Sequence, residues 1–181
     1  ERFAPGSPGV LVVAYDLSAA AMDKAAAAGC RRAQSAADAV RGAGVVITML
    51  PAGSHVRQVW TDDVIPNAEP GALVIDCSTI DVDSARAVAE AATAAGLRAA
   101  DAPVSGGIMA ADAGTLAFMV GCDAALFAEV EQVLAPMARV AIHAGGAGAG
   151  QAATICTTMV LGASMLGVCE AFALAEKLGR E

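Results

Sequence analysis

The sequence predicts an α/β fold in which helices cover both faces of a mostly parallel β-sheet. Short apolar runs alternate with helical patterns along its 181 residues, an order typical of strand–helix–strand units. The chain is 56% hydrophobic but only 3% aromatic, so its core must consist of alanine, aliphatic residues and methionine. Such a composition favours helices packed closely on a sheet. The length fits one domain of ordinary size with part of a second.

Six apolar runs, each followed by a turn or capping residue, predict the strands. The run at 45–50 is apolar almost throughout and is closed by Pro51, which is typical of a strand buried on both faces. The predicted strands are residues 10–15, 45–50, 71–76, 97–100, 115–120 and 139–143.

The helices are predicted from their start and stop signals. Ser18 is an N-cap candidate for a helix that stops at Gly29, Asp81 or Asp83 caps a later helix, and Asp123 caps another. The predicted helices are residues 18–28, 35–40, 54–60, 84–95, 123–134 and 151–178.

The net charge limits which partners are expected, and the cysteine content limits the cellular compartment. The net charge of −8 argues against nucleic acid, whose phosphates would be repelled. Five scattered cysteines without metal-ligand spacing, together with the lack of a secretory signal pattern, indicate a reduced, cytoplasmic protein. No metal site is expected.

One segment, 144–169, has no charged residue and is long enough to be a candidate membrane span. It contains several glycines and Gln151, and it has no basic flank. We therefore expect a buried helix, and no membrane partner.

The segment Asp-Ala-Pro-Val-Ser-Gly-Gly at 101–107 follows a predicted strand. Two glycines after a serine expose backbone N–H groups, which can bind a small carboxylate at Ser105, Gly106 and Gly107. A plain tight turn is the alternative. Asp101, like Asp76 at the end of another predicted strand, is interpreted as a turn or cap residue and not as half of a carboxylate pair.

Four segments in this order and spacing resemble the 3-hydroxyisobutyrate dehydrogenases of the 3-hydroxyacid dehydrogenase family, which is related to 6-phosphogluconate dehydrogenase. The segments are Val-Val-Ile-Thr-Met-Leu-Pro at 45–51, Asp-Cys-Ser-Thr-Ile at 76–80, the 101–107 segment and Gly-Ala-Gly-Gln-Ala-Ala at 148–153. The similarity extends from about residue 10 to residue 179.

The resemblance implies a Rossmann-like NAD-binding domain, partial here, over 1–144, and an interdomain helix over 145–181 that begins an all-α domain. It implies oxidation of a small 3-hydroxy acid to its semialdehyde with NAD, as in valine catabolism. A small carboxylate is the expected substrate, and a homodimer or higher homo-oligomer the expected assembly.

The resemblance also places residues at the cofactor. Leu50, Pro51 and Thr79 would lie along it, and His55 would lie close to it, although a surface helix histidine explains His55 equally well. Asp16 falls at the ribose-binding position, where a carboxylate accepts hydrogen bonds from the ribose hydroxyls and repels a 2′-phosphate, so NAD would be preferred over NADP. A simple turn residue is the alternative for Asp16.

The chain departs from the family at its catalytic helix. The family's Lys-x-x-Asn-Asn is replaced by Thr-Ile-Cys-Thr-Thr, which puts Thr154 at the lysine position and Thr158 at an asparagine position. A threonine hydroxyl cannot supply general-base catalysis, which contributes on the order of 10²–10⁴ in rate. Lys177 lies about 35 Å further along a helix and cannot substitute. We therefore expect little or no dehydrogenase activity from this chain.

The family's first strand and Gly-x-Gly-x-x-Gly loop have no counterpart before residue 10. We expect a sheet that lacks its first strand and a fragment truncated at both ends. The Gly-x-Gly-x-x-Ala pattern at 148–153 is interpreted as a turn into the long helix. Two alternatives remain: a semialdehyde reductase of the same family acting on tartronate or succinate semialdehyde, and a non-catalytic homologue that binds nucleotide or only dimerises.

Overall fold

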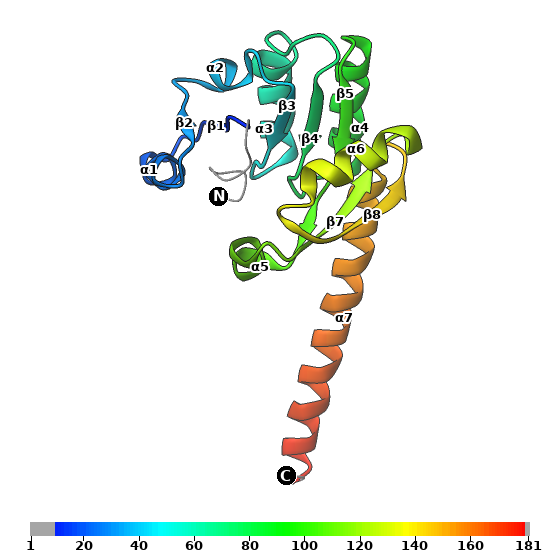
Figure 1. The fold of residues 1–181 in the computed structure, drawn as a ribbon. Coiled ribbons are helices and arrows are strands. Elements are labelled where there is room, and N and C mark those ends of the chain that lie inside the picture. The colour runs from blue at the N-terminus through cyan, green and yellow to red at the C-terminus, as the bar shows by residue number, and fades with distance from the viewer. Residues whose placement is uncertain (1–9, 180–181) are drawn as a thin grey trace.

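The computed structural model describes residues 10–179 and confirms the α/β class (Figure 1). The outer ends of the predicted 1–144 and 145–181 units, residues 1–9 and 180–181, lie outside the described part. The strands are β1 (Val13–Ala14), β2 (Arg31–Arg32), β3 (Val45–Thr48), β4 (Leu73–Asp76), β5 (Arg98–Asp101), β6 (Val104–Ser105), β7 (Leu116–Gly121) and β8 (Ala138–Gly145). The helices are α1 (Ala19–Ala27), α2 (Ala36–Val40), α3 (Gly53–Val59), the π-helical turn η1 (Trp60–Val64), α4 (Val82–Ala94), α5 (Gly107–Ala113), α6 (Ala124–Leu134) and α7 (Ala149–Lys177).

The larger sheet has six strands in the order β3-β4-β5-β7-β6, with β8 paired to β7. The pairs β3–β4, β4–β5 and β7–β8 are parallel, so the predicted mostly parallel sheet is confirmed. β7 runs antiparallel to both β5 and β6. β2, β6 and α5 are not among the elements predicted from the sequence, and each has seven residues or fewer.

The sheet is divided. β1 and β2 form a separate parallel pair, and within the described residues neither strand hydrogen-bonds to β3 (Figure 1). β1 is also much shorter than the predicted strand at 10–15. The expectation that the 45–50 run is buried on both faces is wrong, because Val45 and Ile47 are 38% and 39% exposed. β3 is an edge strand, and only its other face, which carries Val46, packs into a core.

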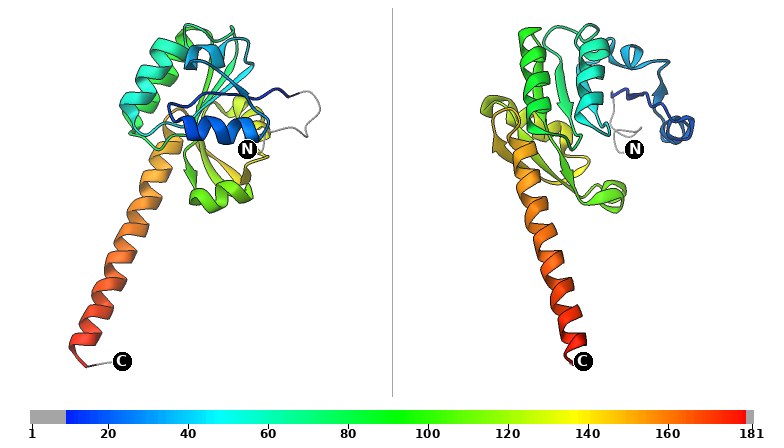
Figure 2. Two further views of the ribbon diagram at one scale, coloured as in Figure 1. Left: turned by 90° about the vertical axis from the view of Figure 1, so that its left-hand side faces the viewer. Right: turned by 180° about the vertical axis from the view of Figure 1, so that it is seen from behind.

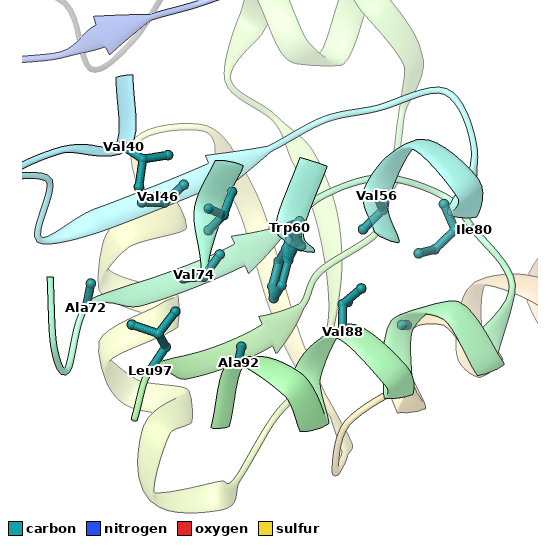
Figure 3. Close-up of a cluster of buried hydrophobic side chains, with 12 residues drawn as sticks. Val40, Val46, Val56, Trp60, Ala72, Val74, Ile80, Val88, Ala92 and Leu97 are labelled. Atoms are coloured by element: carbon teal, nitrogen blue, oxygen red, sulfur yellow. The ribbon is translucent and has the colours of Figure 1, made fainter. Parts of the chain in front are cut away.

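Two core clusters lie on opposite faces of β4, whose four residues are all buried. Val74 packs with Trp60 and with side chains from α3 and α4 (Figure 3). Leu73 and Ile75 pack with Phe118 and with side chains from α6. β4 therefore stabilises both layers of helices.

The predicted helix caps are largely confirmed. The Ser18 hydroxyl accepts a hydrogen bond from the Ala21 amide, and the Asp81 carboxylate accepts one from the Ser84 amide at 2.8 Å. Gly29 has a φ of 91° after α1, as a helix-stop glycine requires. Asp123 stands at the N-cap of α6 without a side-chain hydrogen bond to the helix.

α7 extends away from the sheet (Figures 1 and 2). Only its first turns are buried, through Gly150, Gln151 and Thr154. The expected buried helix is thus wrong for the described residues, because no described element packs against α7 beyond Thr154. By length and hydropathy alone, α7 also qualifies as a membrane span.

Candidate functional site

The candidate site lies at the carboxyl ends of β3, β4 and β5. Because these strands are parallel and adjacent, the loops that follow them, 49–52, 77–81 and 102–103, meet at one edge of the sheet. Ligands of open α/β sheets bind outside this edge.

A buried polar network joins the first two loops. The hydroxyls of Thr48 and Ser78 both donate to Oδ1 of Asp76 at 2.7 Å. The Leu50 amide donates to the Ser78 hydroxyl at 2.7 Å, and the indole Nε1 of Trp60 donates to the Thr48 hydroxyl at 3.1 Å. The network thus fixes the turn after β3 relative to the loop after β4.

Asp76 is the centre of this network and is 2% exposed. Its Oδ2 atom is buried and has no hydrogen-bond partner among the described residues. Burial raises the pKa of Asp76 above its usual value, whereas the hydrogen bonds from Ser78 and Thr48 act in the opposite direction. The charged form of this carboxyl is therefore disfavoured.

Gln151, in the first turn of α7, holds the loop after β4 from the other side. Its Nε2 donates to the Ser78 carbonyl at 2.7 Å, and its Oε1 accepts from the Ile80 amide at 3.0 Å. Both bonds are to main-chain atoms that flank Thr79. Gln151 is fully buried, whereas the Thr79 side chain is exposed between two buried neighbours.

Asp101, at the end of β5, caps the N-terminus of α7. Its Oδ1 accepts from the Gly148 amide at 2.6 Å and its Oδ2 accepts from the Gln151 amide at 2.9 Å. Burial raises the pKa of Asp101, and these two backbone bonds oppose the shift. Asp101 faces Asp76 across β4 and β5, but the two carboxylates bond to separate sets of partners, in agreement with the turn and cap interpretation.

The first turn of α7 approaches β7 so closely that only glycine fits. A Cβ atom on Gly150 would lie 2.2 Å from the Met119 carbonyl oxygen. A Cβ atom on Gly121 would lie 2.3 Å from Oδ1 of Asp101. The glycine cluster at 145–150 therefore forms the turn into α7, as expected from the sequence.

Thr154 lies one helical turn after Gln151 and is 7% exposed. Its hydroxyl donates to the sulfur of Met119 at 3.3 Å, so the hydroxyl is both buried and engaged. Thr158, one turn further along α7, is exposed. Neither side chain is a proton acceptor of the strength that a lysine provides.

The Ser105, Gly106 and Gly107 segment is exposed at the junction of β6 and α5. Within the described residues, neither glycine amide donates to a backbone carbonyl, and both glycines have positive φ. Ser105 pairs with Ala117 of β7, which lies on the same face as Met119, about 7 Å away along the strand. β7 thus connects this segment to Thr154.

Asp16 and His55 stand apart from this junction. Asp16 is exposed after β1, and its Oδ1 accepts from the Ser18 amide at 2.7 Å, as in a turn. His55 is exposed in the first turn of α3. No hydrogen bond joins either side chain to the network around Asp76 in the part of the chain that the structure describes. Pro51 is exposed next to Leu50.

Reasoning from the sequence missed the roles of Gln151 and Met119. Gln151 stands inside the 148–153 segment that carried the resemblance, but its bonds reach residues more than 70 positions away. Met119 alternates with buried residues in β7, which is the ordinary pattern of a strand. Within residues 10–179, no cluster of His, Cys, Asp and Glu could hold a metal ion.

Comparison with known proteins agrees with the resemblance. A probable 3-hydroxyisobutyrate dehydrogenase of Mycobacterium bovis is 50% identical over 171 residues, which cover 94% of this chain and 58% of that protein. An NAD-dependent L-serine dehydrogenase of Pseudomonas aeruginosa is 46% identical over 175 residues, which cover 96% of this chain and 59% of that protein.

A solved structure of Mycobacterium tuberculosis 3-hydroxyisobutyrate dehydrogenase with L-serine matches with a TM-score of 0.92 and 49% identity, covering 96% of this chain and 59% of that one. The chain therefore spans less than two thirds of the length of these relatives. The family model described as the NAD binding domain of 6-phosphogluconate dehydrogenase matches residues 6–160. The chain belongs to the family of the NAD binding domain of 6-phosphogluconate dehydrogenase.

Proposed function

We propose that this chain belongs to a cytoplasmic, NAD-dependent 3-hydroxyacid dehydrogenase of valine catabolism, which oxidises 3-hydroxyisobutyrate to its semialdehyde. The observation that carries the proposal is the hydrogen-bonded junction of the Leu50 turn, the Thr79 loop and the start of α7 at the carboxyl edge of the sheet. The Mycobacterium bovis relative, named a probable 3-hydroxyisobutyrate dehydrogenase, supports it.

In this proposal, Leu50, Pro51 and Thr79 lie along the nicotinamide half of the cofactor. The exposed Thr79 hydroxyl and the fixed main chain around it fit such a contact. NAD would supply the acceptor for the hydride that leaves the carbinol carbon of the substrate. The chain's own residues bind and orient the two molecules.

The amides of Gly106 and Gly107, together with the Ser105 hydroxyl, would bind the substrate carboxylate. These amides are available because no backbone carbonyl accepts from them in the described chain. At the catalytic positions, Thr154 donates to Met119 and Thr158 is exposed, so the chain holds no proton acceptor there comparable to lysine. We expect binding without appreciable turnover.

The preference for NAD tests the assignment of Asp16. We expect the chain to bind NADH at least tenfold more tightly than NADPH, measured by nucleotide fluorescence at low salt, because the Asp16 carboxylate repels a 2′-phosphate. Asp16→Asn should reduce this ratio, whereas Asp62→Asn, at another exposed aspartate, should not. Failure to bind either nucleotide would contradict the proposed function.

L-serine is the second candidate substrate, because one relative is named an L-serine dehydrogenase and a solved neighbour is described with L-serine. Ligand-observed NMR with NADH present should rank 3-hydroxyisobutyrate against L-serine. Ser105→Val should weaken both, since both carry the same carboxylate. If L-serine bound more tightly, it would become the preferred substrate, and the proposed carboxylate site would be unchanged.

A homo-oligomer is part of the proposal. α7 exposes large apolar side chains over most of its length, and these need a covering surface. A second copy of the chain would supply one.

A further inference from the structure

We infer that Gln151 is a positioning residue that sets the conformation of the Thr79 loop, so that the start of α7 and the cofactor-contacting loop move as one unit. The part of this inference that concerns the cofactor rests on the proposed function. The part that concerns the loop rests on the geometry alone.

Gln151 uses both the donor and the acceptor of its side-chain amide. Its side-chain amide has one donor and one acceptor bond, and both go to the main chain on either side of Thr79. No side chain other than Gln151 hydrogen-bonds to the Ile80 amide or the Ser78 carbonyl in the described residues. Gln151 therefore holds the main chain on both sides of Thr79 from a different element, whereas the bonds of Ser78 to Asp76 hold it on one side only.

Gln151 is itself fixed at the start of α7. Its own backbone amide donates to Asp101, and the next turn of the same helix carries Thr154 on the same buried face. A change in the orientation of α7 would therefore be transmitted to Thr79 through two hydrogen bonds. In the proposed function, Thr154 would face the substrate and Thr79 would face the cofactor, and the first turns of α7 hold both residues.

Two variants of Gln151 separate the effect of its acceptor bond from that of its donor bond. Gln151→Leu removes both side-chain bonds at similar volume. Gln151→Glu keeps an acceptor for the Ile80 amide but places a carboxylate oxygen against the Ser78 carbonyl. Gln132→Leu, at an exposed glutamine of α6, is the matched control.

The decisive measurement is amide hydrogen exchange by NMR on the 181-residue chain without nucleotide, with the Val74 amide of the core as internal reference. In Gln151→Leu the Ile80 amide should exchange at least tenfold faster than in the parent, while Val74 is unchanged. In Gln151→Glu the Ile80 amide should stay protected. Equal acceleration of Ile80 and Val74, or no acceleration of Ile80, would overturn the inference.

Nucleotide binding supplies the second readout. Both Gln151 variants should bind NADH about tenfold more weakly and ADP-ribose unchanged, because ADP-ribose lacks the nicotinamide that Thr79 would contact. Equal weakening of both ligands would show that Gln151 does not act through the Thr79 loop. If the parent binds neither ligand, the proposed function fails, and the exchange experiment still decides the role of Gln151.

Discussion

The two carboxylate oxygens of Asp76 differ: Oδ1 accepts from Thr48 and Ser78, while Oδ2 is buried and has no hydrogen-bond partner within residues 10–179. Burial destabilises the ionised form by more than these hydrogen bonds stabilise it, because the pKa of Asp76 is raised overall. Asp76 therefore fixes two loops at the expense of stability at neutral pH.

This balance predicts the pH dependence of folding. Because the folded-state pKa of Asp76 lies above its usual value of 3.8, its contribution to stability is lost as the pH rises through the folded-state pKa. Relative to Asp76→Asn, whose Oδ1 can still accept both hydroxyl bonds, the parent should become less stable between pH 4 and pH 7. Urea unfolding at several pH values measures this difference, with Asp62→Asn as the exposed control. A pH-independent difference would contradict it.

The buried thiols of Cys77 and Cys122 lie near the carboxylates of Asp76 and Asp101, and we expect both thiols to be unreactive. Burial raises the pKa of Cys77 to about 12 and that of Cys122 to about 11. Neither thiol is ionised near neutral pH, so we expect both to resist alkylation in the folded chain.

The sequence could indicate which residue types form the candidate site and their order along the chain, but not which of them are in contact. The Ser105–Gly107 segment was proposed from two glycines after a serine at the end of a predicted strand, whereas Thr79 was placed only by the family resemblance, and both remain predictions. The bonds of Gln151 could not be foreseen, because its partners are remote in the chain. The engagement of the Thr154 hydroxyl with Met119 likewise depends on how α7 packs on β7.

The contact of α7 with β7 predicts opposite effects for two glycine-to-alanine changes in one helix. Gly150→Ala should destabilise the fold, because overpacking against the Met119 carbonyl costs about 1–3 kcal/mol. This cost exceeds the gain of about 1 kcal/mol that alanine brings in helix propensity. A Cβ atom on Gly162 would meet none of the described residues within 4 Å, so Gly162→Ala should retain the gain. Urea unfolding followed by circular dichroism measures both; stabilisation by Gly150→Ala would show that the contact is looser.

The exposed surface of α7 predicts self-association. Leu161, Met165, Val168 and Phe172 recur at intervals of three and four residues and are all more than half exposed. Glutamate at Met165 and Phe172 should weaken association at least tenfold in sedimentation equilibrium, whereas Thr157→Glu should not. A parent chain that stays monomeric at all concentrations would contradict this.

Element boundaries show what sequence patterns can and cannot specify. α4 and α6 were predicted to within a few residues, because their caps and hydrophobic periods are local. The two-residue strands β2 and β6 carry no pattern of their own and exist only through their neighbours β1 and β7. The burial of α7 was predicted wrongly, because apolar composition does not determine which surface covers a helix.

Considered as one body, the chain has a well-packed layer around β4 and a separate, less buried unit of β1, α1 and β2. Hydrogen exchange should therefore reveal two levels of protection. Amides of Leu73, Ile75 and Val120 should exchange last, and that of Arg31 should exchange early. Uniform protection of both groups would indicate a single cooperative unit.

The unpaired edge of β3 affects how the protein behaves in concentrated solution. Its outer row of peptide groups is unpaired in the described chain, and Val45 and Ile47 place apolar surface beside that row without a proline or charge. Such an edge is a template for strands of other molecules and so favours aggregation. Concentrated solutions should form β-rich precipitates unless a charge is introduced, and Ile47→Lys is the change that this edge suggests.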